Sequence, residues 1–247
     1  MEAKKISEIL GSKPYPGRGI IMGRSSDGNH AAIAYFIMGR SANSRNRIFE
    51  ETEGIHNDIR TKAFDECLVT DPSLIIYNPV KTHWDKIIVT NGVQTDEISE
   101  LMDAKRLTFE QALRFIEFEP DAPYYTPRIS GVINFCDSAP FFDYALSIAK
   151  TADGNPESCR RFVYNYSVPI AGQGHFIHTY GDDDKNLPSF SGEPITVEIG
   201  NDIDEFTSTI WNSLHADNKV SLFTRYVSMV DGESQNRIVN KNMGESK

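Results

Sequence analysis

The sequence predicts an α+β fold in which antiparallel sheets form a layered sandwich and helices cover it from outside. Three observations indicate this class: strand-like apolar runs come first, two helical segments follow each other near the middle, and strand-like runs then resume. Strand and helix do not alternate regularly, so a doubly wound parallel sheet is disfavoured. No internal repeat or low-complexity tract divides the 247 residues, and we expect a single domain over residues 1–247.

The amino-terminal segment predicts a β-hairpin. Residues 1–13 form a short polar lead-in, and Pro14 and Pro16 exclude a helix directly before the first apolar run. Residues 19–24 and 30–41 are rich in side chains that fit strands. The SSDGN stretch between them contains an Asp-Gly pair, which is typical of a tight hairpin turn.

The middle of the chain changes from strand to helix. Residues 71–80 and 84–92 predict strands, and the second of them ends in an Asn-Gly pair that favours a tight turn. Residues 95–107 place apolar side chains on one helical face. Thr108 stands three residues before Gln111, which is the spacing of a capping box, so a second helix is predicted to begin there.

The carboxyl-terminal half is predicted to consist mostly of strands. Four segments have strand-like composition: residues 124–135, 160–170, 175–181 and 195–199. Residues 139–154 are amphipathic and fit either a helix or a strand. Residues 202–216 predict a helix that begins at an acidic cap. Residues 232–247 are polar, and we expect them to fray.

The composition excludes several classes of protein. A formal net charge of -10 and a pI near 5.1 argue against a nucleic-acid polymer as partner, because proteins that bind one usually present a basic surface. No apolar run is long enough to span a bilayer, and the first residues lack the apolar core of a secretion signal. We therefore expect no membrane partner and a cytoplasmic location.

Metal and disulfide chemistry find little support in the sequence. Cys67, Cys136 and Cys159 are odd in number and show no CxxC spacing, so we expect reduced, packed thiols. His175 and His178 would share one face of a helix, but their glycine, aromatic and β-branched neighbours favour a strand, where the two rings point to opposite faces. We therefore expect structural histidines and no metal site.

Arginines gather in one stretch of this acidic chain. Residues 15–47 contain a single acid and five arginines, which are Arg18, Arg24, Arg40, Arg45 and Arg47. Guanidinium groups beside turns rich in glycine, serine and asparagine suit a phosphate monoester, so the stretch predicts an anion site. The alternative is weak surface ion pairing with the acids at positions 50, 51 and 53. Arg128 and Tyr77 add to the anion-site hypothesis, because polar side chains at apolar strands usually have a partner.

Familiar catalytic signatures are absent from the sequence. It contains no complete dinucleotide fingerprint, no GxxxxGK[ST] phosphate loop and no GxSxG elbow. The chain begins Met1-Glu2-Ala3, and we expect no amino-terminal nucleophile.

Five motifs, in order along the chain, carry a resemblance to a known family. They are GRGIIMGRSSDGN, MGRSANSR, IIYNPV, VTNGVQTDEI and FEPDAPYYTPRISGVIN, and they lie within residues 15–135. In this order they resemble the archaeal-type inosine monophosphate (IMP) cyclohydrolases and their bacterial relatives. Beyond residue 136 the resemblance is limited to HTYG and ITVEIGNDIDEFTSTI.

The resemblance implies a reaction, a fold and a ligand. The implied reaction is the ring closure of 5-formamidoimidazole-4-carboxamide ribonucleotide (FAICAR) to IMP with loss of water, the last step of de novo purine biosynthesis. The implied fold is a four-layer αββα sandwich that resembles the amino-terminal-nucleophile (Ntn) hydrolases but lacks their nucleophile. Members of the family need no metal or organic cofactor and are oligomers. We therefore expect a purine nucleotide as ligand, no cofactor and a homo-oligomer.

The resemblance also implies roles for particular residues. The functional arginine, tyrosine and glutamate of the family fall on Arg45, Tyr77 and Glu119, with Glu117 as the alternative carboxylate. We expect Arg45 and Tyr77 near the reacting formyl group and Glu119 at the carboxamide or its proton transfers. The residues expected to bind substrate are Arg24, Arg40, Asn91 and Arg128. Arg18 and Arg47 receive no role and are expected to be surface charges.

Two other functions remain compatible with the sequence. A non-catalytic purine-nucleotide sensor on the same scaffold would keep the arginines but not the proton-transfer pair. A sandwich-fold amide hydrolase that uses a cysteine is the weaker alternative. Whether Tyr77 and Glu119 face the same cavity as the arginines distinguishes the enzyme from the sensor.

Overall fold

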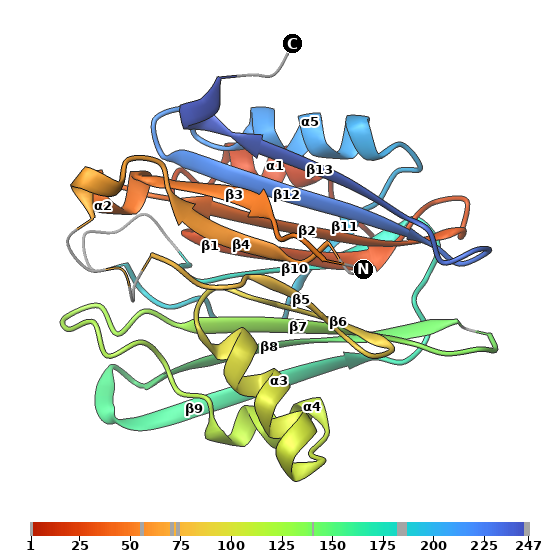
Figure 1. Ribbon diagram of the computed structural model, residues 1–247, viewed down its shortest axis with the longest axis horizontal. Coiled ribbons are helices and arrows are strands. Elements are labelled where there is room, and N and C mark those ends of the chain that lie inside the picture. Colours follow the sequence, from red (N-terminus) through yellow and green to blue (C-terminus); the bar gives the residue numbers. More distant parts are fainter. Residues whose placement is uncertain are drawn as a thin grey trace.

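Two antiparallel β-sheets pack face to face, and helices cover the outer face of each (Figure 1). The computed structural model describes residues 2–54, 57–69, 72, 75–139, 141–181 and 187–244. The predicted α+β sandwich of antiparallel sheets with helices outside is confirmed over this part of the chain. Its layers follow the order helix, sheet, sheet, helix.

The first sheet has the strand order β11-β10-β1-β2-β12-β13. Its strands are β1 (Arg18–Arg24), β2 (His30–Met38), β10 (Gln173–His178), β11 (Ile195–Glu198), β12 (Lys219–Ser228) and β13 (Ser234–Asn240). The predicted hairpin is confirmed, since β1 and β2 pair along the whole length of β1. Every residue of β2 after His30 is buried, because apolar clusters lie on both faces of this central strand.

The second sheet has the strand order β3-β4-β5-β6-β7-β8-β9. Its strands are β3 (Arg47–Glu51), β4 (Ile59–Ala63), β5 (Val80–His83), β6 (Lys86–Thr90), β7 (Arg128–Phe135), β8 (Phe142–Ala152) and β9 (Asn155–Tyr166). The segment 139–154, whose periodicity fits helix or strand, contains β8. This strand pairs with β7 on one side and β9 on the other. Pairing within the sheet therefore decides between helix and strand, a choice that the local sequence pattern leaves open.

Helices lie outside both sheets. α1 (Ile6–Gly11) and α5 (Ile203–Ser213) cover the first sheet, whereas α3 (Gln94–Lys105) and α4 (Phe109–Ala112) cover the second (Figure 1). The short α2 (Ala42–Arg45) follows β2, and 3-10 turns span Glu66–Leu68, Leu113–Phe115 and Lys241–Met243. Among the described residues, no helix combines the length and apolar character needed to cross a membrane.

The two predicted helix caps are confirmed. Thr108 and Gln111 form a reciprocal capping box at the start of α4. The Asp202 carboxylate accepts hydrogen bonds from two backbone N–H groups in the first turn of α5. Each cap forms between residues a few positions apart in the chain, so it can be predicted without knowing the tertiary structure.

Three apolar clusters hold the layers together. One fills the space between the two sheets, one lies under α1 and α5, and one lies under α3 and α4. Side chains alternate between clusters along each strand: Ile20 of β1 belongs to the cluster between the sheets, and Ile21 belongs to the outer one. Both sheets therefore share one interior, and the ends of their strands meet at the rim of the sandwich.

The amino-terminal lead-in contributes to the core, which corrects the prediction for residues 1–13. Ile6, Ile9 and Leu10 of α1 are buried in the cluster under α1 and α5. Their spacing is helical, but a helix of six residues is too short to be stable alone. Contact with α5 therefore decides that this segment is a helix.

The prediction that residues 232–247 fray is wrong for Ser234–Asn240. These residues form β13, which pairs with β12 from Val227 to Ser221. The neighbouring strand β12 has no counterpart among the predicted elements. β13 is an edge strand, and edge strands tolerate the polar composition that makes this segment look frayed.

The cysteines are free thiols, but two of them are not packed. Cys67 and Cys136 are exposed, and Cys159 is partly buried. The prediction of packed thiols is therefore wrong for the first two, because both lie in connecting segments rather than in the core.

The two histidines of β10 point to opposite faces of the strand, as predicted. Nδ1 of His175 lies 2.6 Å from the hydroxyl of Tyr144 between the sheets, whereas Nδ1 of His178 donates to the carbonyl of Tyr180 at 2.7 Å. Burial lowers the pKa of His175 to about 4 and that of His178 to about 3, so both rings are neutral at pH 7. Over the described ranges, no group of three or more His, Cys, Asp or Glu side chains could hold a metal ion.

Candidate active site

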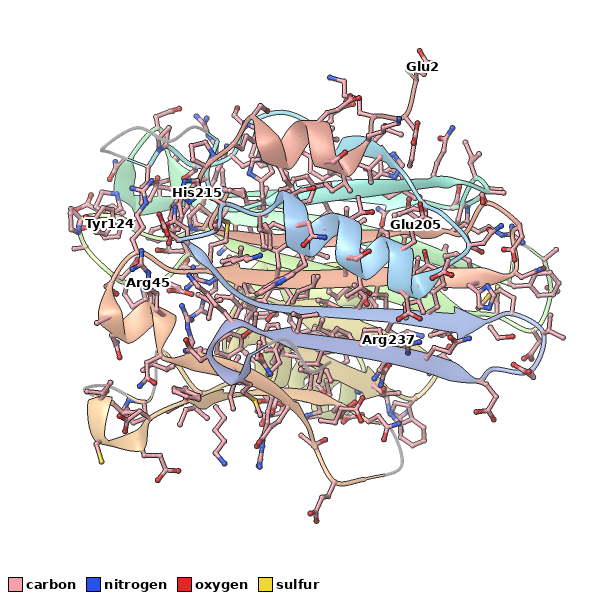
Figure 2. All side chains as sticks on the ribbon, turned by 90° about the horizontal axis from the view of Figure 1, so that it is seen from above. Glu2, Arg45, Tyr124, Glu205, His215 and Arg237 are labelled. Carbon is pink, nitrogen blue, oxygen red and sulfur yellow. The ribbon has the colours of Figure 1, made fainter. Side chains whose placement is uncertain are left out.

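A cavity of about 340 Å³ opens at the end of the sandwich where β1 and β3 begin. Segments that are far apart in the chain line it: Tyr15, Arg18, Arg40, Ser41, Asn43, Ser44, Arg47, Ile75, Glu119, Asp121, Tyr124, Thr126, Tyr180 and Leu187. Figure 2 marks this end of the molecule with Tyr124, at the left of the view and well away from Arg237. The cavity combines three arginines with two carboxyl groups and three tyrosines.

Two arginines, the buried Arg47 and the partly buried Arg18, line the cavity together, so the prediction that they are surface charges is wrong. Each is the first residue of a strand, Arg18 of β1 and Arg47 of β3, and the packing of the two sheets brings these strand ends together. Arg47 is only 2% exposed, and its Nε donates to the carbonyl of Ser44 at 2.9 Å. Arg18 donates from one terminal nitrogen to the carbonyl of Met38 at 3.2 Å, while its buried Nε has no partner.

The arginine pair is an unusual concentration of positive charge. Burial and the neighbouring charge of Arg18 lower the pKa of Arg47 to about 10, which still leaves Arg47 cationic at neutral pH. Burial also opposes the charge on Arg18, but the oxygens of Tyr15 and Glu119 favour it, and its pKa is raised. Two adjacent cations, one buried and one partly buried, and an unpartnered donor are costly without an anion or an oxygen acceptor. A bound ligand that supplies such oxygens would remove that cost.

Glu119 is the carboxyl group that faces the arginine pair. Burial raises its pKa and the charge of Asp121 adds to the shift, whereas Arg18, Arg128 and Arg47 act in the opposite direction. The side chain is partly buried and lines the cavity. A carboxyl group with a raised pKa can hold a proton closer to neutral pH and exchange it with a ligand.

The sequence leaves Glu117 and Glu119 as alternatives, and the structure separates their surroundings. Glu117 is exposed and forms an ion pair with Arg161 at 3.2 Å, outside the cavity. Glu119 lines the cavity together with Arg18 and Arg47, and Glu117 does not.

Aromatic rings form one wall of the cavity. Tyr15 and Tyr180 stack with their ring centroids 5.9 Å apart, and the guanidinium of Arg40 lies 4.1 Å from the centroid of Tyr15. The hydroxyl of Tyr180 lies 2.9 Å from that of Thr126, whose backbone N–H donates to Asp121 at 2.6 Å. The wall offers flat apolar faces next to cationic groups, which suits a planar anionic ligand.

Comparison with known proteins agrees with this geometry. A family model described as IMP cyclohydrolase-like protein matches residues 15–233. The chain belongs to the IMP cyclohydrolase-like family. The resemblance carried by the five motifs is therefore confirmed at the level of the family, and the family match continues well beyond residue 136.

A curated relative supports the same family at lower coverage. An IMP cyclohydrolase of Haloquadratum walsbyi (strain DSM 16790 / HBSQ001) is 29% identical over 122 residues, which is 48% of this chain and 56% of that relative. The matched stretch thus spans about half the length of each protein.

The tyrosine implied by the family resemblance lies next to the arginine pair, but it is not among the described residues that line the cavity, whereas Glu119 is. The hydroxyl of Tyr77 is 2.8 Å from that of Tyr35, and both rings are buried. Both tyrosines act electrostatically on Arg18 and Arg47, which places the four side chains in one cluster. Burial raises the pKa of Tyr35, and the neighbouring Tyr77 raises it further. One of the two hydroxyls donates in this bond, so the other keeps a proton for a further acceptor.

Two arginines that the sequence suggests lie outside the cavity lining. Arg24 is the last residue of β1, about 20 Å from Arg18 at strand spacing, and its Nε donates to the carbonyl of Gly28 at 2.8 Å. Arg45 is exposed on α2, where its Nε donates to the carbonyl of Gly39 at 3.0 Å. Figure 2 places Arg45 at the same end of the molecule as Tyr124. Arg45 thus supports the turn that carries Ser41 and Ser44, whereas Arg24 supports a distant turn.

Asn91 and Arg128 lie behind the cavity. Asn91 is buried, donates to the carbonyl of Pro127 at 2.9 Å and accepts from the backbone N–H of Ile129 at 2.9 Å. These bonds join the residue after β6 to the start of β7. Arg128 begins β7, has a buried Nε without a partner and acts electrostatically on Glu119.

Sequence reasoning overlooks Arg18 and Arg47, although a signal for them exists. Each precedes apolar residues, GIIM after Arg18 and IF after Arg47; the interior of β1 is buried, and so is Phe49 of β3. A charged residue at the start of a buried strand needs a partner. The same rule leads to the inclusion of Arg128 and Tyr77 in the anion-site hypothesis. Applied to every strand, it would include Arg18 and Arg47 as well.

A larger cavity, of about 500 Å³, lies at the opposite end of the sandwich. Its buried cation is Arg225, which already donates to Asn236 at 2.8 Å and to the carbonyl of Asn57. Asp58 and Glu51 further offset the charge of Arg225. Because the buried cation of the larger cavity is already compensated, the smaller cavity is the better candidate for chemistry.

Proposed function

We propose that this protein is an IMP cyclohydrolase that closes FAICAR to IMP with loss of water, the last step of de novo purine biosynthesis. One observation carries the proposal: Glu119, a carboxyl group with a raised pKa, shares one cavity with the arginine pair Arg18 and Arg47. Membership of the IMP cyclohydrolase-like family supports the substrate class. The archaeal relative, which bears the name IMP cyclohydrolase, supports the proposed activity.

The nucleotide is proposed to bind with its phosphate near the mouth and its base inside. Arg40 and the turn from Ser41 to Ser44 line the more exposed side of the cavity. Guanidinium and turn N–H groups suit a phosphate dianion. The imidazole ring then lies along Tyr15 and Tyr180, and its formamido and carboxamide groups point toward the arginine pair. Arg24 is left out of this assignment, and Arg45 acts by holding the turn.

The proposed chemistry begins with attack of the carboxamide nitrogen on the formyl carbon. Negative charge then develops on the formyl oxygen, where Arg18, Arg47 and the hydroxyl pair of Tyr77 and Tyr35 can stabilise it. The attacking nitrogen releases one proton and the formyl oxygen takes one up, which gives a neutral carbinolamine. Both reacting groups belong to one molecule, so holding them in the attacking conformer can contribute on the order of 7–11 kcal/mol at best.

Loss of water completes the reaction. Glu119 gives its proton to the departing hydroxyl of the carbinolamine and takes up the proton that the former formamido nitrogen releases. The sum is FAICAR in, IMP and water out, with no change in the enzyme. Because arginines and a carboxyl group can supply the charge stabilisation and the proton transfers, we propose that no metal or organic cofactor takes part.

The finer expectations about organisation are proposals as well. We propose that the four layers are arranged as in Ntn hydrolases, without the nucleophile, and that residues 1–247 form a single domain, which the shared cluster between the sheets supports. We also propose a cytoplasmic homo-oligomer, in keeping with a soluble step of purine synthesis.

The decisive experiment is turnover of FAICAR by the purified protein, followed by the appearance of IMP in the presence and absence of a chelator. Turnover is expected in both conditions and is expected to fall strongly in Glu119→Gln, while Glu117→Gln serves as the matched control. If the folded protein binds IMP but does not turn over FAICAR, the enzyme hypothesis is wrong and the sensor hypothesis takes its place. The cysteine hydrolase has no support in this cavity, because the described residues that line it include no cysteine.

A further inference from the structure

Gly92 marks a place where two functional side chains approach the backbone. Its φ is not in the left-handed region, so the backbone conformation does not require glycine. Space does: a Cβ atom at this position would lie 2.6 Å from Oε1 of Gln94 and 3.3 Å from Oε1 of Glu119. The two oxygens therefore lie close to the same point, beside the cavity.

The amide of Gln94 is held in one orientation. Gln94 is fully buried as the first residue of α3, and its Nε2 donates to Oδ1 of Asn91 at 2.8 Å and to the carbonyl of Ile129 at 3.3 Å. Asn91 is fixed in turn by the start of β7. With the nitrogen committed to these two acceptors, Oε1 points to the side of Gly92 and Glu119, where it is buried and has no partner.

A buried acceptor without a donor is costly, and the nearby group that can become a donor is the carboxyl of Glu119. Two oxygens that both accept cannot bond to each other, but a protonated carboxyl can donate to an amide oxygen. We propose that Gln94 is a positioning residue that accepts a hydrogen bond from protonated Glu119 and so keeps this carboxyl in its acid form. Its place in catalysis rests on the proposed cyclohydrolase function.

The charges around Glu119 explain why such a partner is needed. Arg18 of β1, Arg47 of β3 and Arg128 of β7 all favour the carboxylate, and only burial and Asp121 favour the acid. These three cations oppose the acid form, which is the form that can protonate a leaving hydroxyl. The Gln94 oxygen adds a contact that exists only for the acid form, so the first proton of the dehydration step is already in place when substrate arrives.

The inference is tested by titrating Glu119 itself in the nucleotide-free protein. Glutamate labelled with ¹³C at the side-chain carboxyl gives a resonance for each glutamate, and Glu119→Gln identifies the one sought. In Gln94→Leu the midpoint of this resonance should fall by about one pH unit, because the acid form loses one hydrogen bond. Gly92→Ala, whose methyl group would lie too close to the Gln94 oxygen and so displace it, should shift the midpoint in the same direction.

Ser99→Ala is the matched control, since Ser99 is buried one turn further along α3 and bonds to His83 instead. It should leave the Glu119 midpoint unchanged. If Gln94→Leu and Gly92→Ala are folded and keep the wild-type midpoint, the inference is wrong. A shift in Ser99→Ala as large as in Gln94→Leu would also overturn it, because a general loosening of α3 would then explain the result.

A kinetic readout separates this inference from the proposed function. With FAICAR as substrate, the alkaline limb of the kcat profile reports loss of the Glu119 proton, and it should move to lower pH in Gln94→Leu but not in Ser99→Ala. Without any turnover, the proposed function fails while the carboxyl titration still decides whether Gln94 holds the proton on Glu119.

Discussion

The two ends of β1 carry the same side chain in opposite situations. Arg24 ends the strand at a turn and donates to the carbonyl of Gly28, so the local loop satisfies it. Arg18 begins the strand, has a buried Nε without a partner and lies beside Arg47 and Glu119. A guanidinium satisfied by its own turn needs no ligand, whereas one left partly unsatisfied in a cavity does. This difference, rather than the number of arginines, identifies the functional end of the sandwich.

The largest effect is expected from removing the carboxyl group that lies beside Arg18. Glu119→Gln keeps the shape but cannot give up or take up a proton, so FAICAR turnover should fall by roughly 10²–10⁴-fold in kcat. Steady-state kinetics measure this, and Glu117→Gln should stay within about twofold of wild type, as expected for an exposed ion pair. Equal losses in both variants would show that Glu119 has no special part.

The arginine pair allows a direct contrast within one strand. Arg47→Met and Arg18→Met should each lower kcat by roughly 10²–10³-fold, because each removes a donor from the developing oxyanion. Arg24→Met should leave kcat and KM nearly unchanged. The thermal midpoint of Arg47→Met should be unchanged or higher, since a buried charge next to Arg18 is removed. If Arg24→Met is as damaging as Arg18→Met, the two ends of β1 are not distinct in function.

Substitutions at the mouth of the cavity should weaken substrate binding more than they slow the chemical step. Arg40→Met is expected to raise KM for FAICAR, and the dissociation constant of IMP, by about 10-fold or more, because a charge-assisted bond to phosphate is lost. Arg45→Met, which alters the neighbouring turn without removing a lining residue, should change both values less. Calorimetric titration with IMP provides the comparison, and inorganic phosphate as competitor reports on the phosphate subsite. A kcat effect with unchanged KM in Arg40→Met would contradict the assignment.

The smallest effect concerns the pH dependence of stability. Because the pKa of Glu119 is raised in the folded protein, the folded state binds this proton more tightly than the unfolded chain. The free energy of unfolding therefore falls, through this group, as pH rises from the ordinary glutamate range toward neutrality. Glu119→Gln removes the titration, so its stability relative to wild type should increase over that pH window in denaturant unfolding. The buried histidines titrate with the opposite sign, but they are common to both proteins and cancel.

The sequence by itself determined the features that depend on neighbours in the chain. The β1–β2 hairpin follows from Asp27-Gly28, and the starts of α4 and α5 follow from the Thr108 and Asp202 caps, because turns and caps close within a few residues. The family, too, is readable from motifs that keep their order. Segments 1–13 and 234–240 escaped prediction, since a short helix and a polar edge strand exist only through α5 and β12.

Only the tertiary structure decided which charged residues form the candidate site. Arg18, Arg47 and Glu119 come from β1, from β3 and from the segment before β7, and no local pattern brings the three together or distinguishes Glu119 from Glu117. The packing of two sheets against each other places the starts of β1 and β3 at one rim and removes water from their arginines. Burial then shifts the pKa values of Glu119 and Arg47, because the cost of desolvating a charge depends on everything that surrounds it.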